Sequence, residues 1–277
     1  MRYTSFRRPS GEASFGRLDG KGGIVDLGGP SGGSLGDALR AGDLDQRPAG
    51  ATLALADVVQ LPLITDPSKI ICIGLNYATH VAETGREQKE HPAIFTRWAD
   101  TLVADGQPLV LPRVSTDFDY EGELAVVIGK GGRAIPADRA LAHVAGYSIF
   151  NDASVRDWQK HNIQFTPGKN FPGTGAFGPS LVTPDEVPDF ASQRVVTRLN
   201  GGVVQDQPVS DMIWGIAEII AYVSAFTPLE PGDVIATGTP GGVGAKRNPP
   251  LWMKPGDLVE VDIGVLGTLT NRVIDEQ

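Results

Sequence analysis

The sequence has one cysteine, Cys72, among 277 residues, which excludes a fold held together by intrachain disulfide bonds. Such a chain suits a reducing compartment, so we expect it to work in the cytoplasm. No apolar run approaches the ~20 residues that a membrane-spanning helix needs. The N-terminal stretch carries charge without the apolar segment of a signal peptide. We therefore expect no membrane partner.

Basic residues are too few to balance the acidic ones. The chain has 24 lysines and arginines against 33 aspartates and glutamates, for a net charge of −9. A nucleic-acid partner needs a basic face, and anionic membranes attract basic segments, so both classes of partner are excluded. With 41% hydrophobic and 21% charged residues, the composition is that of an ordinary globular protein.

Glycine and proline are abundant, with 35 and 21 copies that punctuate short strand-like runs. This pattern indicates an α+β fold that is mostly β. Residues 1–66 consist of short strand-like pieces and differ in this from the rest of the chain. We expect them to form a small N-terminal α+β subdomain, joined by a linker near 64–69 to a larger catalytic domain over 70–277. The expected strands are 3–6, 14–18, 23–27, 70–74, 109–111, 120–129, 146–151, 234–237 and 258–263. The expected helices are 35–39, one through 83 that Asn76 caps, one from a Ser154 cap through about 161, and one over 211–226 that Ser210 or Asp211 caps.

Three carboxylates stand in two strand-like stretches about thirty residues apart: Glu121 and Glu123 in the first, and Asp152 at the end of the second. Residues i and i+2 of a strand share a face, so the two glutamates converge. Buried carboxylates are costly unless they are neutralised, and neither stretch has a basic residue before Arg156. The pattern therefore indicates a hard divalent cation such as Mg²⁺ or Mn²⁺.

Both acidic stretches also have a simpler interpretation. The glutamates could belong to a solvated edge strand, although the apolar run over 124–128 argues against exposure. Asp152 could be a helix cap, but Ser154 fits that role better because Asp157 follows it by three residues, as in a capping box. This assignment leaves Asp152 free to bind an ion.

A second candidate is the pair His80 and Glu83, which share one face of the expected short helix. A carboxylate beside an imidazole orients the ring and raises its basicity, as in a general base that deprotonates water. The alternative is a surface helix with an incidental polar pair, and spacing alone favours that alternative.

Two glycine-rich loops are candidates for binding an anionic substrate. Lys169 lies in the loop 166–175, and Thr239 lies in the loop 237–244. Such loops let backbone N–H groups and an ammonium approach an anion. The first loop lacks the Walker A pattern, so we do not interpret it as a nucleotide loop. For both loops the alternative is ordinary turn chemistry.

Together these segments resemble the fumarylacetoacetate hydrolase family. The matching pieces are residues 73–83, 119–129, 146–159, 168–169, 232–244 and 255–260, so the resemblance spans 70–277. It implies a β-roll catalytic domain in a homodimer, with Mg²⁺ or Mn²⁺ held by Glu121, Glu123 and Asp152. It also implies that a helix carrying His80 and Glu83 closes, with the segment 77–91, over the substrate.

The resemblance assigns further roles. His80, oriented by Glu83, would activate water, and Lys169 would assist catalysis. The residues that would face the substrate are Gln159, Lys169, Thr239 and Tyr77. One position departs from the pattern: Leu75 stands where acylpyruvase-like relatives often have an arginine, which removes a partner for the distal group of the substrate.

The function implied by the resemblance is metal-dependent hydrolysis of the carbon–carbon bond of a 2,4-diketo acid of the acylpyruvate type. The products would be pyruvate and a carboxylic acid, within aromatic or sugar-acid catabolism. One alternative is a decarboxylase or isomerase of 2-keto or 2-hydroxy-dienoic diacids on the same metal site, which needs no activated water. The other is a catalytically silent protein that binds a metal or a small anionic keto acid.

Overall fold

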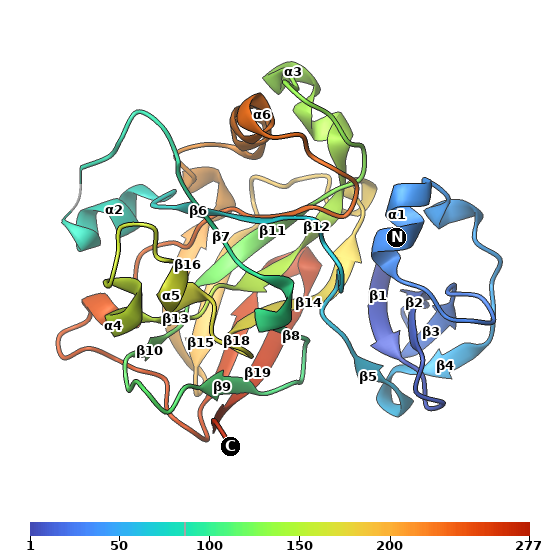
Figure 1. The fold of residues 1–277 in the computed structure, drawn as a ribbon, viewed down its shortest axis with the longest axis horizontal. Coiled ribbons are helices and arrows are strands. Elements are labelled where there is room, and N and C mark those ends of the chain that lie inside the picture. The colour runs from blue at the N-terminus through green and yellow to red at the C-terminus, as the bar shows by residue number, and fades with distance from the viewer. Residues whose placement is uncertain (86) are drawn as a thin grey trace.

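β-Strands dominate the computed structural model, which describes residues 1–85 and 87–277, and this confirms the mostly β, α+β fold (Figure 1). Arg86, which falls in the segment 77–91 expected to close, lies outside the described residues. The N-terminal strands are β1 (Arg2–Arg7), β2 (Ala13–Leu18), β3 (Gly23–Asp26), β4 (Thr52–Ala54) and β5 (Val59–Gln60). The later strands are β6 (Ile70–Gly74), β7 (Ala93–Thr96), β8 (Leu102–Val103), β9 (Leu109–Leu111), β10 (Phe118–Asp119), β11 (Gly122–Ile128), β12 (Val144–Asn151), β13 (Ser154–Val155), β14 (Gly175–Val182), β15 (Arg194–Leu199), β16 (Gly202–Pro208), β17 (Val234–Ala236), β18 (Leu258–Asp262) and β19 (Thr268–Asp275).

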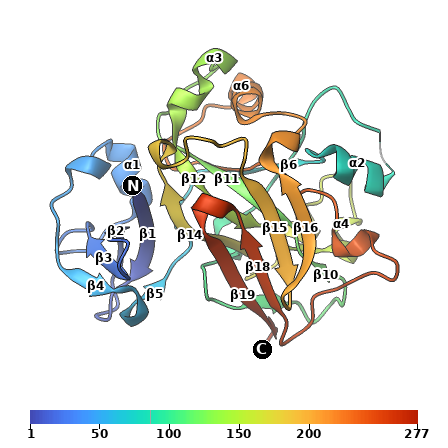
Figure 2. The same cartoon turned by 180° about the vertical axis from the view of Figure 1, so that it is seen from behind.

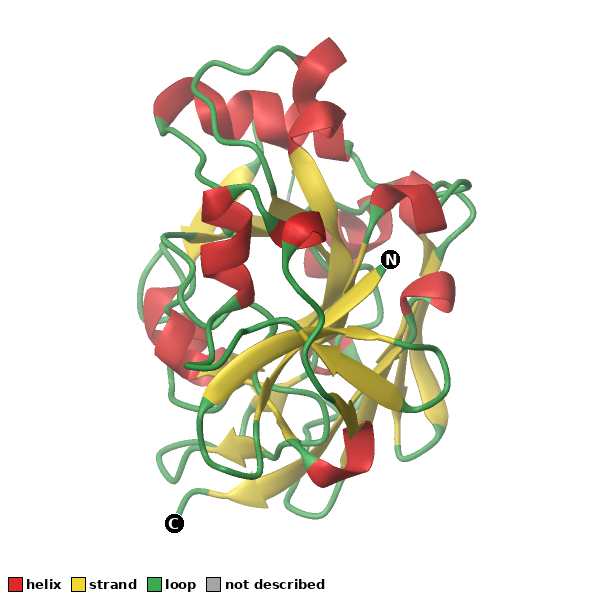
Figure 3. Cartoon of the chain, turned by 90° about the vertical axis from the view of Figure 1, so that its right-hand side faces the viewer, coloured by secondary structure: helices red, strands yellow, loops and turns green. Residues whose placement is uncertain are grey.

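The helices are short and lie around the outside of the strands (Figure 3). They are α1 (Leu35–Ala41), α2 (Ala78–Thr84), α3 (Ala137–Ala140), α4 (Arg156–Gln159), α5 (Thr166–Lys169) and α6 (Ile216–Phe226). Across the described part of the chain, none is long and apolar enough to cross a membrane.

Most strands belong to one large mixed sheet, in the order β4-β3-β2-β1-β14-β12-β11-β17-β6-β7. A second sheet has the order β16-β15-β18-β19-β9, and β10 pairs separately with β13. Figure 2 shows β1–β4 gathered at one side of the molecule and β15, β16, β18 and β19 side by side. Because β1 pairs with β14, the N-terminal strands extend the large sheet, and the domain boundary near 66 stays a prediction.

Strand β11 is buried on both faces, and this burial determines the position of the acidic residues at its N-terminal end. Leu124, Val126 and Ile128 pack into one hydrophobic cluster, while Ala125 and Val127 pack into another. Alternating side chains of a strand point to opposite faces. Two apolar faces therefore hold the register of β11, and its acidic N-terminal end stands at the rim of the core.

Two expected helices begin later than their predicted caps. Ser154 does not cap a helix, because it pairs in β13 with Asp119 of β10, and its hydroxyl donates to the Asp152 carbonyl oxygen. The helix α4 is confined to Arg156–Gln159 and does not reach 161. Similarly, α6 starts at Ile216 instead of 211, since residues 209–211 form a separate 3₁₀ turn.

Asn76 likewise does not cap α2, which begins at Ala78. Its carboxamide instead joins two other segments: the nitrogen donates to the carbonyl oxygens of Trp214 and Thr237, and the oxygen accepts from the Trp214 amide. The end of α2 at the left-handed Gly85 is confirmed. Asn76 thus anchors the start of the helix that carries His80.

Candidate active site

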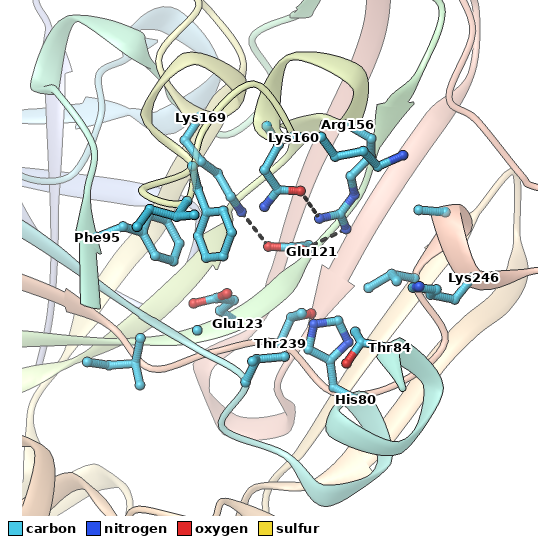
Figure 4. A pocket seen from close by; sticks show the side chains of 18 of the residues that line it. His80, Thr84, Phe95, Glu121, Glu123, Arg156, Lys160, Lys169, Thr239 and Lys246 are labelled. Atoms are coloured by element: carbon cyan, nitrogen blue, oxygen red, sulfur yellow. Dashed lines mark hydrogen bonds and ion pairs between the residues drawn. The ribbon is translucent and has the colours of Figure 1, made fainter. Parts of the chain in front are cut away.

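A cavity of about 560 Å³ opens where the N-terminal end of β11 meets α2, α4 and α5. Six of the nine residues predicted for the site line it: His80, Glu121, Glu123, Gln159, Lys169 and Thr239. The other three, Glu83, Asp152 and Tyr77, do not line it. Arg156 and Lys246 also line the cavity, and Figure 4 shows the labelled side chains converging on it.

The three acidic residues meet as the sequence predicts. Glu121 precedes β11, Glu123 lies in it, and Asp152 follows β12, whose antiparallel pairing with β11 brings the two strand ends together. The Asp152 amide donates to the Glu121 carbonyl oxygen at 2.9 Å. One carboxylate oxygen from each residue lies within 4.8 Å of the others, and all three residues are buried. This oxygen-rich set has the composition of a Mg²⁺ or Mn²⁺ site.

The acids are not without basic neighbours, which corrects the argument from the two stretches alone. Lys169 contacts Glu121 at 2.6 Å and also pairs with Asp152. Arg97 pairs with Asp152 at 2.6 Å, and Arg156 pairs with Glu121 at 2.7 Å. These cations lie outside the two acidic stretches, so the stretches by themselves do not reveal the pairing. Two of the three carboxylates are therefore neutralised within the chain.

Glu123 is the exception. Its carboxylate accepts the Gly238 amide at 2.8 Å, and within the described residues it forms no ion pair. Burial and the neighbouring Asp152 and Glu121 raise the pKa of Glu123 well above its usual value. For Glu121, burial acts in the same direction, but Arg156 and Lys169 outweigh it and lower the pKa to about 2. The unbalanced carboxylate beside two others fits a bound divalent cation.

His80 and Glu83 form the predicted pair on α2. His80 Nδ1 lies 2.7 Å from Glu83 Oε1, and the second oxygen of Glu83 accepts the Gly242 amide at 2.8 Å. Because Nδ1 is engaged, Nε2 is the nitrogen left for chemistry. Figure 4 shows His80 and Lys169 on opposite sides of Glu121 and Glu123. This arrangement has the geometry predicted for a base that faces the acidic cluster.

Lys169 is almost completely buried, at 1% exposure, and its ammonium lies 4.9 Å from the centre of the Phe95 ring. Burial lowers its pKa, but Asp152 and Glu121 outweigh burial and raise it. The lysine is therefore held in the charged form.

Gly168 allows α5 to pack closely against α4, because a Cβ at this position would lie 2.4 Å from the Gln159 amide nitrogen.

The other residues predicted to face the substrate, Gln159, Thr239 and Tyr77, differ in their hydrogen-bond partners. The Gln159 carboxamide oxygen accepts from Arg156 at 2.9 Å. The Thr239 hydroxyl donates to the Gly122 carbonyl oxygen at 3.0 Å and accepts from Gln205 at 2.8 Å. Tyr77 is fully buried, and its hydroxyl has no hydrogen-bond partner in the described part of the protein. The structure does not place Tyr77 on the cavity, and its contact with substrate stays a prediction.

Sequence reasoning missed three functional neighbours: Arg97, Arg156 and Gln205. Arg97 is fully buried and also donates to the Ala153 carbonyl oxygen and the Thr174 hydroxyl. Gln205, on β16, donates to Thr239 and accepts the Gly122 amide at 3.0 Å. Arg156 lies inside a matched motif, which was the available signal. Arg97 and Gln205 stand in segments without any such signal.

Comparison with known proteins gives a family match and close relatives. The family model for the fumarylacetoacetate (FAA) hydrolase C-terminal region matches residues 69–274. The mitochondrial oxaloacetate tautomerase FAHD2A of Bos taurus is 42% identical over 80% of this chain and 71% of its own length. The oxaloacetate tautomerase YisK of Bacillus subtilis is 43% identical over 79% of this chain and 74% of its own.

Solved structures agree with this match. A fumarylacetoacetate hydrolase from Exiguobacterium antarcticum superposes with a TM-score of 0.86 at 36% identity, and the alignment covers 100% of both chains. A 5-carboxymethyl-2-hydroxymuconate delta-isomerase from Mycobacterium smegmatis gives a TM-score of 0.83 at 32% identity, also over 100% of both chains. Similar folds thus carry names for different reactions, so the reaction must be argued from the site.

Proposed function

The chain belongs to the fumarylacetoacetate hydrolase family, and we propose that it catalyses keto–enol tautomerisation of a short 2-oxo dicarboxylate of the oxaloacetate type. The observation that carries this proposal is the placement of a base, His80, and a buried ammonium, Lys169, on opposite sides of one acidic cluster. The names of two relatives above 40% identity support the choice of reaction. This choice moves tautomerisation ahead of the hydrolysis expected from the resemblance.

Tautomerisation moves one proton between C3 and the oxygen on C2, while the double bond shifts between C2–C3 and C2–O. His80 Nε2, held by Glu83 through Nδ1, takes the proton from C3 and delivers it to the C2 oxygen when the enol forms, and carries it back when the keto form is restored. Lys169 presents its ammonium to the C2 oxygen, where negative charge develops. A divalent cation held by Glu121, Glu123 and Asp152, which we propose to be Mg²⁺ or Mn²⁺, would act as a Lewis acid on the 2-oxo carboxylate.

The test is the approach of freshly dissolved enol oxaloacetate to its keto form, followed by the loss of enol absorbance. We expect the protein to accelerate this loss with Mg²⁺ or Mn²⁺, and EDTA to abolish the acceleration. The uncatalysed rate in the same buffer is the control. A rate equal to that control, with metal bound, would reject tautomerisation of this substrate.

Hydrolysis of an acylpyruvate is the second candidate, and the rigid His80–Glu83 pair favours it. Both oxygens of Glu83 are engaged, by His80 and by the Gly242 amide, and such an oriented base suits activation of water. Acetylpyruvate tests this candidate, since hydrolysis would release pyruvate and acetate.

Two further readouts separate the remaining possibilities. Release of CO₂ from oxaloacetate would indicate a decarboxylase, and double-bond migration in a 2-hydroxy-dienoic diacid would indicate an isomerase. Metal binding without turnover of any of these acids would indicate a silent binding protein. We also propose that the protein is a cytoplasmic homodimer, and light scattering on the purified chain tests the dimer.

A further inference from the structure

We propose that Asp119 is a positioning residue that fixes the distance between the base His80 and the acidic cluster. Its effect on turnover rests on the proposed function, whereas its effect on geometry does not. Asp119 ends β10, just before the acidic stretch, and it is fully buried. It does not line the cavity, so it acts through the residues that it holds.

Four N–H groups converge on the Asp119 carboxylate. Oδ1 accepts the amides of Tyr120 at 2.9 Å and Gly244 at 2.8 Å. Oδ2 accepts Arg156 Nε at 2.8 Å and the Ala245 amide at 2.9 Å. A carboxylate that accepts from both oxygens and donates from neither matches this set of donors.

The first arm runs through Arg156 to the acidic cluster. While Nε is held by Asp119, the other two nitrogens reach Glu121 at 2.7 Å and the Gln159 carboxamide oxygen at 2.9 Å. A guanidinium is planar, so fixing Nε fixes the directions of the other two nitrogens. Asp119 therefore sets the orientation of one predicted metal ligand and of one predicted substrate contact.

The second arm runs through the turn Gly244–Lys246 to the His80 pair. Gly244 is required for the approach, because a Cβ there would lie 2.6 Å from Asp119 Oδ1 and 1.9 Å from the Leu251 carbonyl oxygen. Two residues earlier, Gly242 donates its amide to Glu83 and accepts the Tyr120 hydroxyl at 3.0 Å. The loop that Asp119 anchors thus supports Glu83, which orients His80.

The experiment compares Asp119→Asn with the matched control Asp26→Asn. Asp26 is also buried and holds an arginine, Arg8, together with Ser14 and the Gly28 amide, but it belongs to the N-terminal region and not to the cavity. For Asp119→Asn we expect Mn²⁺ affinity to fall about 10- to 100-fold and kcat to fall by a similar factor, with a smaller change in KM. For Asp26→Asn we expect both quantities to match the wild type, whatever happens to Tm.

A third readout does not depend on turnover. With ¹⁵N-labelled histidine, we expect the ring resonances of His80, among the four histidines, to shift in Asp119→Asn and to stay in place in Asp26→Asn. Unchanged His80 resonances together with wild-type Mn²⁺ affinity would overturn the proposal. If the wild type turns over none of the acids above, the proposed reaction fails, while these two readouts still decide the role of Asp119.

A second variant covers the case in which Asp119→Asn does not fold. Ala245→Pro deletes one of the four N–H donors and leaves Asp119 intact, and proline is tolerated in the first turn of a helical segment. We expect a shift of the His80 resonances and a loss of kcat in the same direction as for Asp119→Asn. Wild-type resonances and kcat in Ala245→Pro would overturn the second arm.

Discussion

At the scale of a single residue, Glu123 links the titration of a buried carboxyl group to the stability of the fold. Its pKa is raised by burial and by Asp152 and Glu121, so the folded chain retains a proton that the unfolded chain releases above the ordinary value of 4.5. The stability from this proton is complete below 4.5 and is lost as the pH rises toward the raised pKa. A bound cation would offset the cost of ionising the buried Glu123 carboxyl group.

We therefore expect the Tm of the metal-free protein to fall as the pH rises above about 4.5, through this group. Glu123→Gln, which cannot ionise, should flatten that part of the profile. Calorimetry in EDTA-treated buffer measures both curves. Glu121 has the opposite effect on stability. Its pKa is lowered to about 2, so the stability that its charged form contributes is lost as the pH falls below 4.5. If the Tm of Glu123→Gln and that of the wild type changed with pH in the same way, Glu123 would not be the group that lowers stability above pH 4.5.

Variants at His80 and Glu123 should distinguish a loss of turnover from a loss of metal binding. Replacing His80 by alanine removes the base but no carboxylate, so we expect turnover to fall about 10²- to 10⁴-fold while Mn²⁺ binding is retained. Glu123→Ala should lose stoichiometric Mn²⁺ binding, as measured by calorimetric titration. Wild-type turnover by His80→Ala would remove the base from the mechanism, and unchanged Mn²⁺ binding by Glu123→Ala would remove that residue from the site.

The predictable part of the site is the part that depends on short spacings. Alternation along a strand places Glu121 and Glu123 together, and helical spacing pairs His80 with Glu83. The partners that balance charge are different, because Arg97 lies 55 residues from Asp152 and Lys169 lies 48 residues from Glu121. Contacts over such separations depend on the whole topology.

At the scale of the element, β11 is both a scaffold for the acids and a wall shared by two hydrophobic clusters. Leu124 is fully buried directly after Glu123. We expect Leu124→Ala to lower the free energy of unfolding by about 2–5 kcal/mol, since it leaves a cavity in a packed core. Denaturant titration measures the change. Val203→Ala, at a residue 56% exposed on β16, is the control and should change stability by less than about 0.5 kcal/mol.

Element ends were harder to predict than element cores. Ser154 and Asn76 have the right side chains to cap helices, yet neither caps one. The Ser154 hydroxyl donates to the Asp152 carbonyl oxygen while its backbone pairs with Asp119, and the Asn76 carboxamide bonds distant segments. A cap rule considers a few neighbouring residues, whereas the Asn76 carboxamide joins segments more than a hundred residues apart. The first turns of α4 and α6 were consequently misplaced, while α1 and the C-terminal end of α2 agree with their predictions.

At the scale of the whole molecule, the N-terminal region shares the core of the large sheet. Tyr3 and Phe15 pack in the same cluster as Phe177 and Leu181 of β14. A chain lacking residues 1–66 would expose those two β14 side chains, at a cost of about 1.5–3 kcal/mol each. We expect its Tm to fall by about 10 °C. An unchanged Tm would show that residues 70–277 form a self-sufficient domain.

Cys72 lies in β6, inside that core, next to strand β17, which pairs with β11. It is fully buried, and burial, with Asp152 and Glu123, raises the pKa of its thiol, so the reactive thiolate is suppressed. A thiol reagent added to the native protein therefore reports how often the sheet opens, at a single position in the chain. We expect Mn²⁺ to slow this labelling and truncation of residues 1–66 to hasten it. The labelling rate of the single thiol would then measure how often the fold opens around the candidate site.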